Sequence, residues 1–168
     1  AIEKNMFRQL KAGKISEQDQ VAALKRIART IDIADLGKND LIIEAATEDE
    51  RTKQKIFESL RPHLKSDTIL TSNTSSISIT RLASGTDRPE KFLGFHFMNP
   101  VPVMQLVELI RGIATNQETY DICLGVVENL GKTAASAEDF PAFIVNRILM
   151  PMINEAVYTP VSYTHLRA

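Results

Sequence analysis

The sequence predicts an α/β fold with a largely parallel sheet, preceded by a helical hairpin and followed by a long helix. Two observations carry this prediction. From residue 40 onward, short apolar runs of strand length alternate with amphipathic helical segments. Before that point, apolar residues recur only at helical spacing. A chain of 168 residues is long enough for one domain with a real core, or for one domain and part of another.

The residues up to about 36 have the pattern of a hairpin of two helices. Ile2, Met6 and Leu10 recur every four residues, and Gly13 suits a helix C-cap. The string "SEQD" at residues 16–19 resembles a capping box and predicts a second helix over "QVAALKRIART". We interpret the basic residues of the first helix as a solvated face, with contact to a nucleotide phosphate as the alternative; they are Lys4, Arg8, Lys11 and Lys14.

The pattern changes after Gly37. The continuous apolar run "DLIIEAA" predicts a strand that is buried on both faces. Further strands are predicted from "DTILTS", "KFLGFHFM" and "QLVELIRG", with "KTAASAE" as a possible edge strand. Between them, helices are predicted from "RTKQKIFESLRPHL", "SITRLASG" and "NQETYDICLGVVENLG", and "FPAFIVNRILMPMINEAVYT" opens a long final helix.

Composition excludes several classes of function. The net charge is −1, so no strong electrostatic field attracts nucleic acid or a membrane, and we expect neither as a partner. We expect no leader peptide. A single cysteine, Cys123, fits a reducing cytoplasm. We interpret it as a buried small hydrophobe rather than a reactive thiol. The three histidines lack metal-ligand spacing, so no metal site is predicted.

Polar residues follow the predicted strands where ligands are expected. In such sheets, ligands bind beyond the carboxyl ends of the strands, which points to residues 44–48, 72–76 and 96–99. The string "TSNTSS" could hold a phosphate, a ribose or a carbonyl oxygen, and a Ser/Thr-rich turn is the alternative. The string "EAATEDE" offers Glu44, Glu48 and Glu50, any of which could accept hydrogen bonds from ribose hydroxyls, and a solvated helix start is the alternative.

His96 lies in a strand-like run and faces opposite to its phenylalanine neighbours. Glu108 lies in the next such run, after the proline-containing link "NPVPV". Two adjacent strands could bring the imidazole and the carboxylate into contact, which would leave the other ring nitrogen free as a general base. A satisfied core histidine and a solvated strand charge are the alternatives. Asn146, in the final helix, could donate to a carbonyl oxygen or form an interhelical hydrogen bond.

Together these strings resemble the 3-hydroxyacyl-CoA dehydrogenase family, most closely its bacterial members that act on 3-hydroxybutyryl-CoA. The resemblance covers about residues 1–159 and rests on "LIIEAATEDE", "TSNTSSISIT", "FLGFHFMNPVPVMQLVELIRG" and "FIVNRILMPMINEA". It implies a Rossmann-like, partial doubly wound sheet with a projecting helical hairpin, followed by the start of an all-α domain. The divisions are then 1–140 for the cofactor domain, 141–159 for the first helix of a dimerisation domain, and 160–168 for a tail unlike the family.

The resemblance also implies a reaction, the oxidation of a 3-hydroxyacyl-CoA with NAD or the reverse, with NADP left open, and a homodimer in the full-length family. His96 would be the acid–base and Glu108 its orienting carboxylate. Ser75 would bind the substrate oxygen, and Asn146 would help to position the substrate. The cofactor contacts would come from Glu48, Lys53, Ser75 and Asn99.

Three departures from the family pattern lead to expectations. The sequence contains no G-x-G pair, so we expect the chain as printed to bind NAD weakly and to turn over poorly. The family reads Pro-Gly-Phe where this chain has Pro141-Ala142-Phe143, so an alanine would cost stability there if the backbone has a positive φ. Pro160 is expected to end the last helix.

Two other functions compete with the dehydrogenase. A Ser-His-Glu acyl-CoA hydrolase would use Ser75, His96 and Glu108, but it would need a nucleophile elbow and an oxyanion hole. The other is an inactive partial fold that associates through exposed helices.

Overall fold

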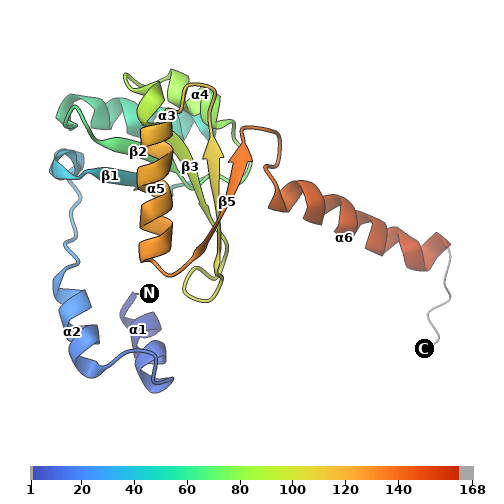
Figure 1. Cartoon of the computed structure of the whole chain (residues 1–168), viewed down its shortest axis with the longest axis horizontal. Helices are drawn as coiled ribbons and strands as arrows, with labels where there is room; N and C mark the ends of the chain where they lie inside the picture. Colours follow the sequence, from blue (N-terminus) through green and yellow to red (C-terminus); the bar gives the residue numbers. More distant parts are fainter. Residues whose placement is uncertain (1, 163–168) are drawn as a thin grey trace. The chain divides into compact units, whose positions relative to one another are not determined.

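The structure is a computed structural model that describes residues 2–162 (Figure 1). The chain divides into two compact units, Ala1–Asp35 and Leu36–Ala168. The smaller unit is the predicted helical hairpin, and the larger one contains the sheet.

The hairpin consists of α1 (Ile2–Lys11) and α2 (Glu17–Lys25). Gly13 turns the chain between them with φ of 66°, and the predicted capping box at Ser16 is present. The helix predicted over residues 20–30 is shorter than expected, because α2 ends at Lys25. There the amides of Arg26 and Ile27 turn to carbonyls three residues back, which tightens the last turn and stops the helix.

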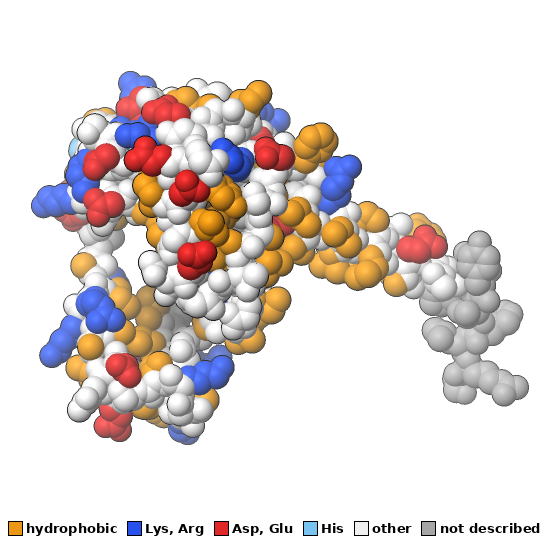
Figure 2. Space-filling model, viewed as in Figure 1, with side chains coloured by type: hydrophobic (Ala, Val, Ile, Leu, Met, Phe, Trp, Pro, Cys, Tyr) orange, Lys and Arg blue, Asp and Glu red, His pale blue; other side chains and the backbone are white. Residues whose placement is uncertain are grey.

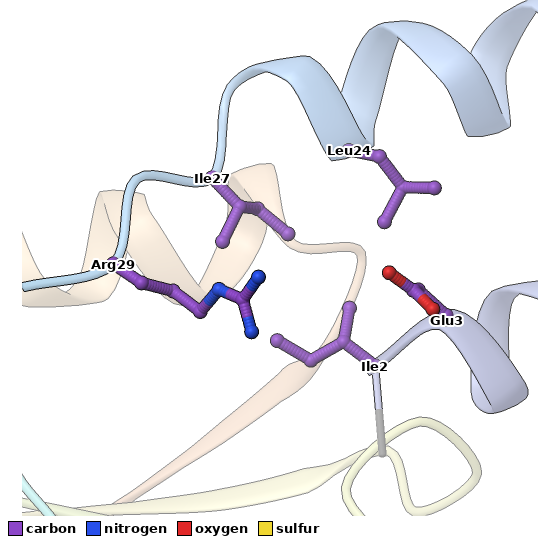
Figure 3. A pocket seen from close by; sticks show the side chains of 5 residues that line it. All are labelled: Ile2, Glu3, Leu24, Ile27 and Arg29. Carbon is purple, nitrogen blue, oxygen red and sulfur yellow. The ribbon is translucent and has the colours of Figure 1, made fainter.

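A hollow of about 380 Å³ lies within the hairpin (Figure 3). Ile2 and Glu3 line it from α1, and Leu24, Ile27 and Arg29 line it from α2 and the segment after it. Three apolar side chains, the Glu3 carboxylate and the Arg29 guanidinium line it, so the hollow is of mixed polarity.

The larger unit is built on a five-stranded sheet in the order β1-β2-β3-β4-β5. The strands are β1 (Leu41–Glu44), β2 (Ile69–Ser72), β3 (Phe92–Phe97), β4 (Leu106–Arg111) and β5 (Thr133–Glu138). The first three run parallel, β4 is antiparallel to β3, and β5 is parallel to β4. The sheet is therefore largely parallel, with one antiparallel pair at its centre.

Helices cover both faces of this sheet. Their bounds are α3 (Glu50–Leu60), α4 (Ile79–Ser84), α5 (Gln117–Asn129) and α6 (Val145–Ser162), with short 3₁₀ turns η1 (Ile33–Lys38), η2 (Arg61–His63) and η3 (Pro89–Lys91). On one face, Cys123 and Val127 of α5 pack on Phe95 and Leu109. On the other, α3 and α4 lie behind the sheet in Figure 1, and Phe57 meets the edge of the Phe92 ring. This is the expected Rossmann-like, doubly wound arrangement.

Local signals set the ends of these helices. Asp49, Ser78 and Asn116 cap α3, α4 and α5, each accepting an amide hydrogen bond three residues later. Gly131 follows α5 with φ of 65°, as the sequence predicts. Cys123 is fully buried, and burial raises the pKa of its thiol to about 12, which confirms the interpretation as a small hydrophobe.

Two expectations about the elements are wrong. β1 is not buried on both faces, because it is an outer strand of the sheet and Ile43 is 40% exposed. α6 does not end at Pro160 but continues to Ser162. A proline removes one hydrogen bond of the helix, and so close to the end that loss does not stop it. The rest of the predicted tail, residues 163–168, lies outside the described residues.

No helix in the described part of the chain is both long and apolar enough to cross a lipid bilayer.

Candidate active site

His96 and Glu108 face each other across the antiparallel pair of β3 and β4. His96 Nδ1 lies 2.7 Å from Glu108 Oε2, so the predicted contact is confirmed. The alternation of β3 explains the geometry, since Phe95 and Phe97 point into the core under α5 and His96 points to the other face. Both side chains are buried, and Glu108 is fully so.

The second oxygen of Glu108 binds the start of α6. Oε1 accepts hydrogen bonds from the amides of Ile144, at 2.9 Å, and Val145, at 2.8 Å. Burial pushes the pKa of Glu108 upward, but the hydrogen bonds from His96 and from the two amides outweigh it and leave the pKa below its ordinary value. Glu108 is therefore a carboxylate that only accepts.

Ser75 lies on the free side of the imidazole. Its Oγ is 3.1 Å from His96 Nε2, and it comes from the loop that follows β2. Asn146, in the first turn of α6, donates from Nδ2 to the carbonyl oxygen of Ser75 at 3.2 Å. The structure thus brings together the four residues predicted as catalytic, from β3, β4, the loop after β2, and α6.

Glu48 organises the loop that carries Ser75. Its Oε1 accepts from the hydroxyls of Thr74 and Ser76 and from the amides of Ser75 and Ser76, at 2.6 to 3.0 Å. Burial raises the pKa of Glu48, and these hydrogen bonds outweigh burial, so the pKa lies below its ordinary value. Its side chain remains 41% exposed, and Oε2 lies 3.7 Å from the Lys53 amine.

Lys53 has a different environment from the one the sequence suggests. Its side chain is 1% exposed, and Nζ donates to both oxygens of Glu44 at 2.9 and 2.8 Å. Ser72 Oγ also donates to Glu44. Glu44 therefore belongs to a buried ion pair beneath the loop. The available signal was an acidic residue inside an apolar strand with a lysine nine residues later.

Two asparagines, Asn73 and Asn99, follow the strands β2 and β3. Asn99, predicted near the cofactor, is exposed beyond the end of β3. Among the hydrogen bonds of the described residues, none joins its side chain to Ser75 or His96. Asn73 has a role that sequence reasoning missed, since its Oδ1 accepts from the Phe97 amide at 2.9 Å and ties the loop after β2 to the end of β3.

Comparisons with known proteins agree with one another. Residues 1–140 match the family described as "3-hydroxyacyl-CoA dehydrogenase, NAD binding domain". A 3-hydroxybutyryl-CoA dehydrogenase of Bradyrhizobium diazoefficiens is 56% identical over 158 residues, which cover 94% of this chain and 54% of the relative. A probable 3-hydroxybutyryl-CoA dehydrogenase of Bacillus subtilis is 43% identical over 157 residues, covering 94% and 55%.

Solved structures give the same result. The crystal structure of (S)-3-hydroxybutyryl-CoA dehydrogenase from Ralstonia eutropha is similar with a TM-score of 0.90 and 45% identity, over 93% of this chain and 55% of that chain. The chain thus spans about half the length of the curated relatives that it matches.

Proposed function

Because the chain belongs to the 3-hydroxyacyl-CoA dehydrogenase family, we propose that it converts the 3-hydroxyl group of an acyl-CoA thioester to a 3-oxo group, or runs the reverse reduction. The observation that carries the proposal is the contact of His96 with the buried Glu108 on one side and with Ser75 on the other. With Nδ1 bound to Glu108, the histidine can accept or donate one proton at its other ring nitrogen, Nε2.

The direction of that proton transfer follows from the hydrogen bonds. Since the Glu108 carboxylate can only accept, it fixes the imidazole proton on Nδ1 of His96. Nε2 then presents a lone pair toward Ser75 Oγ, 3.1 Å away. In oxidation, Nε2 takes the proton of the 3-hydroxyl, and Glu108 stabilises the imidazolium that forms. In reduction, the imidazolium returns the proton to the 3-oxygen.

Ser75 and Asn146 act on the substrate side of this histidine. The Ser75 hydroxyl shares the space next to Nε2, where it can donate to the substrate oxygen and hold it beside the base. The Asn146 side chain donates to the Ser75 carbonyl oxygen and would help to orient the acyl group of the substrate. Both residues are held by main-chain contacts, which limits the geometries in which a substrate fits.

The cofactor of the family fits the end of the sheet where β1, β2 and β3 terminate. Glu48 has one oxygen engaged by the loop, while its side chain is 41% exposed, so its other oxygen suits ribose hydroxyls. The Lys53 amine, 3.7 Å from Glu48 Oε2, would support Glu48 in this role. By the family resemblance, Ser75 and Asn99 would face the nicotinamide end. Bound NAD supplies the acceptor for the hydride that leaves C3.

The hydrolase alternative is not supported, although Ser75, His96 and Glu108 have the contacts of a triad. An oxyanion hole needs free amides beside the nucleophile. The amides of Ser75 and Ser76 instead donate to the Glu48 carboxylate, which would repel an oxyanion. The relatives reported above are dehydrogenases.

We propose in addition that α6 takes part in a homodimer in the cytoplasm. Several apolar side chains of α6 are more than half exposed, and Figure 2 shows orange hydrophobic side chains gathered along this helix, which a partner helix would cover; they include Ile148, Met150, Met152, Val157 and Tyr158.

Reduction of acetoacetyl-CoA, followed by the loss of NADH absorbance, tests the proposed function. We expect His96→Gln to lower kcat by about 10²–10⁴-fold, because a general acid–base contributes on this order. His63→Gln, in the exposed turn η2, serves as the matched control and keeps the rate. The assay is run on the chain as printed and on the complete reading frame that encodes it. Equal rates for His96→Gln and wild type would refute the role of His96, and covalent labelling of Ser75 by a fluorophosphonate would favour the hydrolase.

A further inference from the structure

We propose that Phe143 and the first turn of α6 are positioning groups that hold the Glu108 carboxylate in line with His96. The kinetic part of this inference rests on the proposed function. Its structural part concerns the contact between α6 and β4 alone and can be tested without catalysis.

One carboxylate joins α6 to the imidazole. Oε1 of Glu108 accepts from the amides of Ile144 and Val145, and Oε2 faces His96 Nδ1. The two oxygens of a carboxylate lie in one plane with fixed separation, so holding Oε1 with two donors also sets the direction of Oε2. The position of α6 therefore determines where the imidazole is held.

The chain reaches this arrangement through unusual backbone geometry. Ala142 and Phe143 have φ of 67° and 52°, two consecutive left-handed residues that are not glycine. Such strain concentrates at functional sites, where the surrounding structure enforces it. Here the left-handed pair turns the next two amides inward onto Glu108.

The Phe143 side chain contacts the same histidine. It is 3% exposed, and its ring centroid lies 6.0 Å from that of His96 in an edge-on arrangement. Phe143 thus packs against the imidazole while its backbone delivers the amides to the partner carboxylate. Two independent contacts from one turn converge on the His96–Glu108 pair.

An ordinary helix cap would not need this geometry. A cap is usually a Ser, Thr, Asn or Asp next to the helix, and exposed amides at a helix start can also bind water. Here the acceptor is the fully buried Glu108, which precedes Ile144 by 36 residues and Val145 by 37. Its other oxygen binds the histidine proposed as the acid–base.

A proline at position 145 removes one of the two donors and places its ring Cδ where the N–H had pointed toward the Glu108 carboxylate. Val145 is the first residue of α6, where proline is well tolerated because that amide has no partner within the helix. We expect Val145→Pro to raise the titration midpoint of Glu108, followed by the carboxyl ¹³C signal, by about one pH unit. Val145→Ala keeps the N–H and therefore keeps the wild-type midpoint.

The kinetic readout separates positioning from folding. We expect Val145→Pro to lower kcat by about tenfold with less than about a twofold change in KM, since the loss concerns the acid–base and not substrate binding. A Val145→Pro protein with a wild-type circular dichroism spectrum and an unchanged Glu108 midpoint would overturn the proposal.

A second variant keeps the test decisive if the proline prevents folding. Phe143→Leu keeps an apolar side chain and both amide donors but removes the aromatic contact with His96, so we expect it to lower kcat while the Glu108 midpoint stays near the wild-type value. An unchanged kcat in this variant would overturn the proposal. If wild type reduces no acetoacetyl-CoA in either arm of the assay described above, the proposed function fails, while the titration still decides the positioning role.

Discussion

At the scale of single residues, Lys53 shows how this site tolerates a buried charge. An ammonium group with 1% exposure has lost its hydration, a cost that only close partners offset. Both oxygens of Glu44 bind Nζ, and Ser72 and the Ala46 amide satisfy the remaining positions of the carboxylate. The Lys53 amine also lies 3.7 Å from Glu48 Oε2, so the ion pair contacts the residue that holds the loop carrying Ser75.

We expect Lys53→Met to lower the free energy of unfolding by about 3–5 kcal/mol, because it leaves the Glu44 carboxylate buried without its partner. The double variant Glu44→Leu/Lys53→Met removes both charges and should regain most of that loss. Urea denaturation of the two proteins measures the difference. A double variant no more stable than the single one would contradict this account of the pair.

The residues of the candidate site differ in how far sequence could predict them. His96, Glu108, Ser75 and Asn146 were predicted together, because their strings and spacing carry a family resemblance and because adjacent strands bring the first two into contact. The partners of Lys53 and the amide donors to Glu108 were not predicted. They depend on which side chains end up buried and on backbone groups distant in sequence, and residue identity encodes neither.

At the scale of elements, the segment between β5 and α6 stores conformational strain. Ala142 adopts φ of 67°, a region where a Cβ costs about 1–2 kcal/mol. The family has a glycine at this position, from which the sequence predicts that alanine costs stability if φ is positive. The structure shows that φ is positive.

We expect Ala142→Gly to raise the free energy of unfolding by about 0.5–1 kcal/mol, the strain relieved minus the extra entropy of glycine in the unfolded chain. Ala83→Gly, within α4, is the matched control and should lower it, since its backbone is helical. Chemical denaturation of both variants beside wild type checks the opposite signs. A loss of stability in Ala142→Gly would show that the alanine methyl group contributes packing that outweighs the strain.

Helix ends were predicted best where one residue decides them. Gly13, Ser16 and Gly131 each work through their own backbone or side chain, and all three have the predicted role. The end of α2 and the exposure of Ile43 were mispredicted, because the first depends on where the last turn tightens to carbonyls three residues back and the second on the place of β1 in the sheet. Propensity alone does not contain that information.

At the scale of the whole molecule, several partly or fully buried carboxylates make the fold sensitive to acid. Glu48, Glu108 and Asp139 are all pushed upward in pKa by burial, and hydrogen bonds outweigh burial in each, so that each pKa is below its ordinary value. Asp139 links the end of β5 to the start of α4 through Ser78, Ile79 and Thr80.

A group whose pKa is lower in the folded state stabilises the fold above its unfolded pKa, and that contribution is lost as the pH falls through the folded value. We therefore expect the free energy of unfolding to fall steadily between about pH 5 and pH 3. Asp139→Asn should be less stable at pH 7 and should lose less over the same interval. Denaturation at several pH values measures both slopes, and parallel curves would exclude Asp139 as a contributor.

The burial of Cys123 has a practical consequence for labelling. The chain has one cysteine, and with a thiol pKa of about 12 it carries almost no reactive thiolate at neutral pH. A new cysteine placed at an exposed position, such as Lys11 in the hairpin or Glu118 in α5, would accept a maleimide fluorophore while the native thiol stays unmodified. Site-specific dyes can therefore be introduced into either unit without first removing the natural cysteine.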